Sequence, residues 1–205
     1  MDKEKIKKNV REILAEIGED VDREGIQATP DRVARLYENL YYRYRKRLVV
    51  MDEKTRNSKV ESDVIPVTVF KNIECKEMLI RSVEFLSTCE HHNVPFRGKA
   101  FVGIIPNEYL LGMNKIDKIV KYFAAGLQIQ ERMTGEIANW IDENIKPVGV
   151  IVVIKAEHFC AISQGDSGWF TTSAVRGEFL KPKPDKGNPR EEFLQLIAHE
   201  LGEVK

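Results

Sequence analysis

The chain has 205 residues, of which 42% are hydrophobic and 31% charged, and its 32 basic residues balance its 32 acidic residues. This neutral balance argues against nucleic acid or an anionic membrane as the main partner, although local cations could still bind a small polyanion. The length suits one core with an extension rather than two equal domains. Three cysteines are too few for a disulfide framework and suit a reducing compartment, so we expect a cytoplasmic protein.

The first fifty residues predict a helical extension. Apolar residues between positions 6 and 17 recur at helical spacing, and Gly18 ends that stripe. Thr29 followed by Pro30 marks the start of a second helix. That helix runs into the basic segment 43–47, which reads as a solvated helix end rather than an anion site. Residues 51–64 are polar and predict a linker or loop.

The remaining residues, 65–205, predict one catalytic-sized domain of strands and helices. Strand-like runs cover residues 65–70, 78–85, 99–105, 148–154 and 171–179. A helical stretch over 114–144, broken near 126–129, lies among them, and a last helix covers 189–201. This order predicts an α+β sheet with its helices on one face.

A possible metal site is the most informative feature of the sequence. Residues 89–92 read Cys-Glu-His-His, and Cys160 follows far along the chain. Two thiols and one imidazole form a Cys₂His set that leaves the fourth position of a zinc ion open for water or substrate. The alternative to a metal site is that Cys89 is a small buried hydrophobic residue and that His92 is an ordinary hydrogen-bonded histidine. The nearby His91 and His158 favour chemistry over a structural role.

Several blocks of this chain together resemble the GTP cyclohydrolase I family. They are residues 87–92 (Ser-Thr-Cys-Glu-His-His), 98–100 (Gly-Lys-Ala), 105–107 (Ile-Pro-Asn), 130–132 (Gln-Glu-Arg) and 158–160 (His-Phe-Cys). Residues 18–20 and 28–33 also match the first helices of that family. The similarity runs from about residue 13 to the C-terminal helix. The order Cys-Glu-His-His and then a distant His-x-Cys is highly specific.

The resemblance implies a reaction and roles for the histidines and thiols. Zinc held by Cys89, His92 and Cys160 would activate water for attack on C8 of guanine. His91 would act as the general acid on the ring nitrogen, and His158 would move protons during ring opening, loss of formate and ring rebuilding. GTP and water would become 7,8-dihydroneopterin triphosphate and formate.

Guanine recognition is assigned by the same resemblance to Glu131, with Gln130 beside it. A carboxylate can accept hydrogen bonds from both N1–H and the exocyclic amine of guanine, a pairing that adenine does not offer. Without the resemblance, Glu131 would read as an acid on a helix surface.

The phosphate-binding positions depart from the family pattern. Lys115 is kept, but Asn114 replaces a serine, Lys118 replaces an arginine and Gln164 replaces another arginine. Losing one charge-assisted phosphate contact, of about 1.5–3 kcal/mol, would weaken GTP binding roughly ten- to a hundredfold. Arg176, or a basic residue of a neighbouring subunit, could replace the missing cation.

The resemblance also implies the tunnelling fold, an antiparallel sheet with a helix pair on one face, preceded here by the N-terminal helical extension. Family members assemble as homo-oligomers, decamers of two pentamers, with active sites at subunit interfaces. Two alternatives remain open. One is a diverged cyclohydrolase that acts on another guanine nucleotide or stops at an imidazole-opened intermediate. The other is a non-catalytic binder of guanine nucleotide or pterin, against which the retention of both proton-carrying histidines argues.

Overall fold

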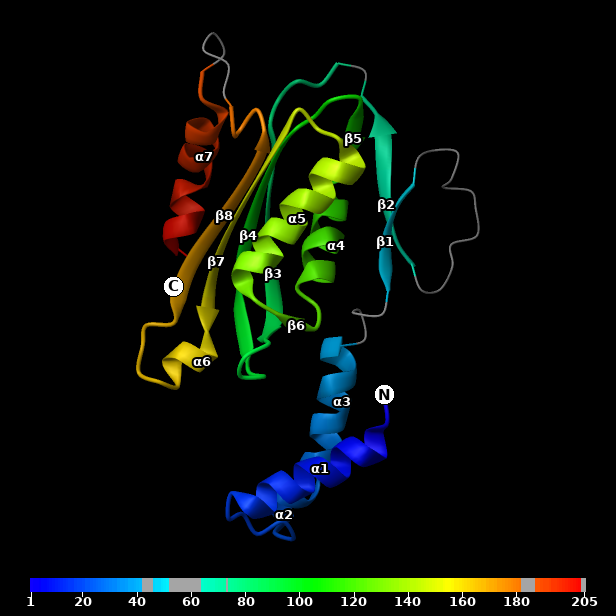
Figure 1. Ribbon diagram of the computed structural model, residues 1–205, viewed down its shortest axis with the longest axis vertical. Helices are drawn as coiled ribbons and strands as arrows, with labels where there is room; N and C mark the ends of the chain where they lie inside the picture. The colour runs from blue at the N-terminus through cyan, green and yellow to red at the C-terminus, as the bar shows by residue number, and fades with distance from the viewer. Residues whose placement is uncertain (42–45, 52–63, 73, 182–186, 204–205) are drawn as a thin grey trace. The chain divides into compact units, whose positions relative to one another are not determined.

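The structure is a computed structural model that describes residues 1–41, 46–51, 64–72, 74–181 and 187–203 (Figure 1). The chain divides into two compact units, Met1–Arg45 and Lys46–Lys205. Residues 47–50, which the sequence assigns to the helical extension, form part of a strand in the second unit. The polar segment predicted as a linker lies almost wholly outside the described residues, and so does most of the basic segment 43–47.

The described part of the first unit is helical. Its elements are α1 (Lys3–Glu16), α2 (Glu24–Gln27) and α3 (Thr29–Tyr41). Gly18 has a φ of 90°, a left-handed backbone that glycine adopts without steric cost, and it ends the first stripe as predicted. An ion pair between Lys7 and Asp31 at 2.7 Å joins α1 to α3. Lys7 and then Arg35 lower the pKa of Asp31 to about 2.

The second unit contains two sheets. In the three-stranded sheet, of order β1-β2-β5, β1 (Arg47–Met51) runs parallel to β2 (Val64–Lys71), and β5 (Tyr109–Leu111) runs antiparallel to β2. The five-stranded sheet has the order β6-β3-β4-β7-β8. Its strands are β3 (Leu79–Cys89), β4 (Pro95–Ile105), β6 (Leu127–Gln128), β7 (Gly149–His158) and β8 (Trp169–Gly177). All neighbours pair antiparallel except β6, which is parallel to β3, so the predicted antiparallel α+β sheet is confirmed.

A helix pair covers one face of the five-stranded sheet (Figure 1). It consists of α4 (Met113–Phe123) and α5 (Gln130–Ile145), and the break between them holds β6, close to where the sequence predicts it. Ile119 and Ile137 from the helices are completely buried with Val102 and Val152 from the strands. Burial of such side chains stabilises the fold by about 1.5–3 kcal/mol each.

The opposite face of the sheet is packed by α7 (Pro189–Glu203). Phe193 is fully buried there with Phe101 and Ile151, which alternate along their strands with residues of the other face. The predicted helix pair on one face of the sheet is confirmed by α4 and α5, whereas the sequence gives no indication of the face on which the last helix packs. Apolar residues in a helix indicate that it packs, but not which side of a sheet it packs on.

The short helix α6 (Phe159–Ile162) follows β7 at the end of the sheet where β3 also ends (Figure 1). Near this end, a Cβ at Gly98 would lie 2.2 Å from the carbonyl oxygen of Lys155. Glycine therefore allows β4 and β7 to approach closely and keeps the strand ends together. None of the helices in the described ranges is both long and apolar enough to cross a membrane.

Candidate metal centre

The candidate site lies where three strands of the five-stranded sheet begin or end. Cys89 is the last residue of β3 and His158 is the last residue of β7. Between these strands, β4 begins at Pro95, and its second residue, Phe96, pairs with His158. Cys160 follows in α6. Two segments that are far apart in sequence therefore bring their thiols and imidazoles to one end of the sheet.

Cys89, His92 and Cys160 form a cluster that could hold a metal ion, with their ligand atoms all within 4.8 Å of one another. The Sγ atom of Cys89 lies 3.7 Å from Nδ1 of His92 and 4.0 Å from Sγ of Cys160. A tetrahedral zinc site with Zn–S bonds of about 2.3 Å separates its ligand atoms by about 3.8 Å. The donor set and its spacing therefore fit zinc, whereas a disulfide would need sulfurs about 2.05 Å apart.

The surroundings of the thiols also suit a bound cation. Burial raises the pKa of Cys160, and the neighbouring Cys89 raises it further. Cys89 itself is only 6% exposed. A thiolate is costly at such a position unless a positive charge lies beside it, and a bound metal ion supplies that charge.

The turn that follows β3 carries His91 and His92. The N–H of Cys89 donates to the carbonyl of Val94, and the N–H of Asn93 donates back to the carbonyl of Cys89, both at 2.8 Å. Asn93 closes the turn in the left-handed region, at a φ of 55°. His91 is exposed beside the cluster, with its ring centroid 6.3 Å from that of His92.

His158 is held rigidly beside the cluster. Its ring stacks on Phe96, with centroids 4.5 Å apart and planes 6° from parallel, and meets the edge of Phe170 at 5.4 Å. Nε2 of His158 lies 2.8 Å from Oε1 of Gln130. Burial lowers the pKa of His158, and the charge of Glu131 opposes that effect.

Gln130 fixes the orientation of this histidine. Its side chain is 1% exposed, and its Nε2 donates to the backbone carbonyls of Ile154 at 3.1 Å and Phe170 at 3.2 Å. Carbonyls only accept, so the amide oxygen must face His158 and accept from its Nε2–H. The side chain of Gln130, predicted to contact substrate, is thus used within the protein.

Glu131 and Arg132 follow on the first turn of α5. Glu131 is exposed and follows Gln130, the residue that is hydrogen-bonded to His158. Arg132 forms an ion pair with Glu90 in the turn after β3 and lowers the pKa of Glu90. Neither Arg132 nor Glu90 was assigned a role from the sequence, although each lies inside a signature block. Their opposite charges were the one feature of the sequence that could have suggested an ion pair between them.

The predicted phosphate-binding residues Asn114, Lys115 and Lys118 lie on α4, whose first turns are away from the cluster (Figure 1). Asp117 on the same helix accepts hydrogen bonds from Arg81 at 2.8 and 3.0 Å. Arg81 precedes Cys89 by eight residues of β3, which corresponds to about 26 Å. The C-terminal end of α4 is the one near the cluster. There the carbonyl of Phe123 accepts a hydrogen bond of 3.1 Å from Gln128, which pairs with Cys89.

The remaining predicted residue, Gln164, is close to the cluster. It is exposed, and its Nε2 donates to the carbonyl of Cys160 at 2.9 Å. Arg176, considered as a replacement cation, pairs with Val150 at the start of β7, far from His158. Its guanidinium donates to Oδ1 of Asn139 at 2.6 and 3.0 Å. Arg176 therefore does not replace the missing cation within the same chain.

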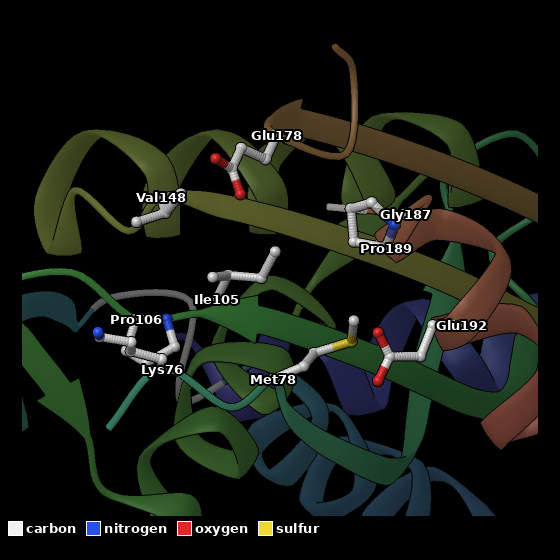
Figure 2. A pocket seen from close by; sticks show the side chains of 9 residues that line it. All are labelled: Lys76, Met78, Ile105, Pro106, Val148, Glu178, Gly187, Pro189 and Glu192. Atoms are coloured by element: carbon white, nitrogen blue, oxygen red, sulfur yellow. The ribbon is translucent and has the colours of Figure 1, made fainter. Parts of the chain in front are cut away.

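A cavity of about 310 Å³ opens at a different place in the second unit (Figure 2). Its lining comes from the segment before β3, the end of β4, and the segments flanking β7, β8 and α7: Lys76, Met78, Ile105, Pro106, Val148, Glu178, Gly187, Pro189 and Glu192. No thiol or imidazole is among these side chains. The cavity is thus separate from the cluster of Cys89, His92 and Cys160.

Comparison with known proteins gives a consistent result. The sequence profile described as "GTP cyclohydrolase I" matches residues 6–198. The protein named "GTP cyclohydrolase 1" of Aquifex aeolicus is 41% identical over 202 residues, covering 96% of this chain and 97% of that protein. The one of Caldanaerobacter subterraneus subsp. tengcongensis is 43% identical over 203 residues, again covering 96% and 97%. That of Saccharomyces cerevisiae is 38% identical and covers 92% of this chain and 72% of the yeast protein.

Among solved structures, the archaeosine synthase QueF-Like in its apo form aligns with 51% of this chain and 97% of its own, at 15% identity and a TM-score of 0.44. The assignment of this chain to a family therefore rests on the sequence relatives.

Proposed function

This chain belongs to the GTP cyclohydrolase I family, a family of hydrolases that act on C–N bonds, and on that premise we propose that it converts GTP and water to 7,8-dihydroneopterin triphosphate and formate. The observation that carries the proposal is the grouping at one end of the sheet. There, the Cys₂His cluster lies beside His158, and His91 and Glu131 are next to these groups in the turn and on α5.

We propose zinc as the resident metal, held by Cys89, His92 and Cys160. Two thiolates and an imidazole suit zinc by softness, and three protein ligands leave one position for water or substrate. A zinc ion held there would supply Lewis-acid activation of water at neutral pH. Thiolate ligands must stay reduced, and the cysteines are free thiols, which agrees with the cytoplasmic location that we propose.

His158 is the proposed proton carrier of the reaction, and the hydrogen bond to Gln130 determines which atom acts. Because Nε2–H is donated to Gln130, the Nδ1 atom carries the lone pair of the neutral ring. A proton would therefore be accepted and returned at Nδ1. His91, exposed in the turn, is the proposed general acid on the ring nitrogen of guanine.

Glu131 is the proposed guanine anchor. It lies on the first turn of α5, its side chain is exposed to solvent, and it follows Gln130, which is hydrogen-bonded to His158. A carboxylate at this place could accept from N1–H and the amine of guanine. Gln130 supports this arrangement through His158 rather than through the base.

We propose that the substrate site is completed by a second copy of the chain. The first turns of α4, with Lys115 and Lys118, lie away from the cluster within one chain, so a neighbouring copy would have to supply these cations. Large apolar side chains beside the cluster are also exposed, and a contacting copy would cover them: Leu127 at 44%, Phe159 at 41% and Phe170 at 50%. A homodecamer of two pentamers is the assembly proposed from the family.

A second candidate function is favoured by the altered phosphate positions. The side chain of Gln164 is neutral and donates a hydrogen bond to the backbone carbonyl of Cys160. The guanidinium of Arg176 is hydrogen-bonded to Asn139, away from the cluster. A cyclohydrolase acting on a guanine nucleotide with fewer phosphates, or one stopping at an opened imidazole ring, would tolerate these changes.

Product analysis tests the proposal. Zinc-loaded protein is incubated with GTP, GDP or guanosine, the products are identified by mass spectrometry, and formate is assayed in parallel. Dihydroneopterin triphosphate with one formate per GTP is the expected result. Faster turnover of GDP or guanosine, or an accumulating opened-ring product, would support the second candidate instead. Binding of GTP without any product would support a non-catalytic binder.

A further inference from the structure

Two of the three proposed metal ligands, the buried Cys89 and the exposed His92, lie in one short segment at the end of β3. We call residues 89–92 the ligand turn. Two hydrogen bonds join Cys89 to Asn93 and Val94, which follow the ligand turn, and a further bond from the N–H of Glu90 to the carbonyl of Gln128 at 3.1 Å attaches the turn to β6. His92 is exposed. Cys89 is also held by the pairing of β3 with β6, so the contacts of Glu90 matter most for the exposed end of the ligand turn, which carries His92.

The carboxylate of Glu90 is held by Arg132 of α5. The same guanidinium donates from Nε to Oε1 of Gln128 at 3.0 Å and from Nη2 to the carbonyl of Leu127 at 3.4 Å. One arginine thus contacts the ligand turn and both residues of β6. A planar guanidinium can satisfy several acceptors at fixed angles, which a lysine ammonium does not do.

The groups that Arg132 contacts are themselves rigid. Gln128 is 6% exposed, and its Nε2 donates to the carbonyl of Phe123 at 3.1 Å and to Glu136 at 2.8 Å. Next to Arg132 on α5, Met133 is fully buried in the core. The ion pair therefore connects an exposed turn to a fixed part of the fold.

We propose that Arg132 is a positioning residue that holds the ligand turn against α5, so that Cys89 and His92 are in place before a divalent metal ion binds. This inference rests on the proposed metal site. Without the ion pair, metal binding would have to order the turn as well, and that ordering would weaken affinity. Residues that orient metal ligands typically change metal affinity by about 10- to 100-fold when substituted.

The test measures metal affinity in Arg132→Met, Glu90→Gln, the double variant and Arg132→Lys. Arg81→Met is the matched control, since Arg81 likewise forms an ion pair with a carboxylate of another element, and its side chain is 45% exposed against 41% for Arg132. The Zn²⁺ dissociation constant of each metal-free protein is measured by competition with a chromophoric chelator. Thiolate-to-Co²⁺ absorption reports the ligand set, and urea unfolding of the metal-free proteins reports stability.

Both single variants should raise the Zn²⁺ dissociation constant about 10- to 100-fold. The double variant should lose no more than the worse single variant, because the two residues share one interaction. Arg132→Lys should recover only part of the affinity, Arg81→Met should bind as the unchanged protein does, and the cobalt absorption should persist in all of them.

Unchanged zinc affinity in Arg132→Met and Glu90→Gln, with unfolding at lower urea, would reduce the ion pair to a structural contact and overturn the proposal. An equal loss of affinity in Arg81→Met would also overturn it. If the unchanged protein shows no thiolate-to-cobalt absorption, the metal site of the proposed function fails first, and the positioning role fails with it.

Discussion

The two ends of the five-stranded sheet differ in how firmly a single chain holds the side chains proposed for the site. At the end that carries Cys89, the thiols and the ring of His158 are fixed by strand pairing, ring stacking and the buried amide of Gln130. At the end where α4 begins, Asn114 is exposed, and an ion pair between Arg81 and Asp117 joins the helix to β3 in addition to its buried apolar contacts.

This difference matches what each half of the proposed substrate needs. Attack on a ring carbon and proton transfer require reacting atoms about 3–3.5 Å apart, so the groups must be rigid within one chain. An ammonium group attracts phosphate as a point charge with little directional demand, so it can be supplied by a neighbouring copy. We therefore expect changes at the cluster to affect turnover and changes at α4 to affect substrate binding.

The largest effect is expected at the cluster itself. Cys160→Ala removes one of the three proposed ligands, so the protein should lose bound zinc, and formate release should fall by at least about a thousandfold. Metal analysis and a formate assay check this. Cys75→Ala is the matched control, because Cys75 is a free thiol outside the cluster and should leave both quantities unchanged. Zinc retained at full occupancy in Cys160→Ala would contradict the ligand assignment.

A large effect without metal loss is expected from His158→Gln. Removing a proton carrier should lower kcat by about 10²- to 10⁴-fold, while the zinc content and KM stay close to those of the unchanged protein. Steady-state kinetics and metal analysis separate these quantities. If zinc is lost along with activity, His158 supports the metal site rather than proton transfer.

A smaller effect, confined to binding, is expected on α4. Lys115→Met should raise KM for GTP roughly tenfold, through the loss of one charged phosphate contact, with kcat nearly unchanged. The same substitution should not alter KM for guanosine, which lacks phosphate. Equal changes with GTP and guanosine would show that Lys115 does not contact the phosphates, and would break the contrast between the two ends.

The smallest effect is expected from the ion pair that ties α4 to β3. Arg81 holds the pKa of Asp117 below its ordinary value of about 3.9. A lowered pKa stabilises the fold above the unfolded value, and that contribution is lost as the pH falls through the folded value. Asp117→Asn should therefore lower the free energy of unfolding by less than about 1 kcal/mol at pH 7, since the pair is largely exposed.

Urea unfolding at several pH values tests this point, and the difference between Asp117→Asn and the unchanged protein should shrink as the pH approaches 3 and below. A difference that grows with acidity would have the wrong sign for a lowered pKa.

Much of the site could be predicted from sequence because its chemistry is carried by residue types with narrow roles. Cys89, His92 and Cys160 stand at strand ends, where segments distant in sequence converge, and the structure brings them together. The positioning residues could not be predicted in this way. Glu90 and Arg132 look like ordinary surface charges, and nothing in the sequence shows that the amide of Gln130 is buried against His158.

The fold shows the same limit. The strands β2, β3, β4, β7 and β8 and the helix pair follow from apolar patterning, whereas the short β5 and β6 do not. β1 does not either, because an apolar run that continues from a helix pattern gives no sign of its partner strand β2. The side of the sheet on which α7 packs is decided by Phe101 and Ile151, whose alternation becomes meaningful only when the sheet is known.

The most direct measurement follows formate release as zinc is added back to metal-free protein with GTP in excess. If Cys89, His92 and Cys160 form the catalytic centre, activity should rise in proportion to bound zinc and stop rising at one zinc per chain. Formate release by zinc-free protein, or activity that saturates well away from one zinc per chain, would contradict this account.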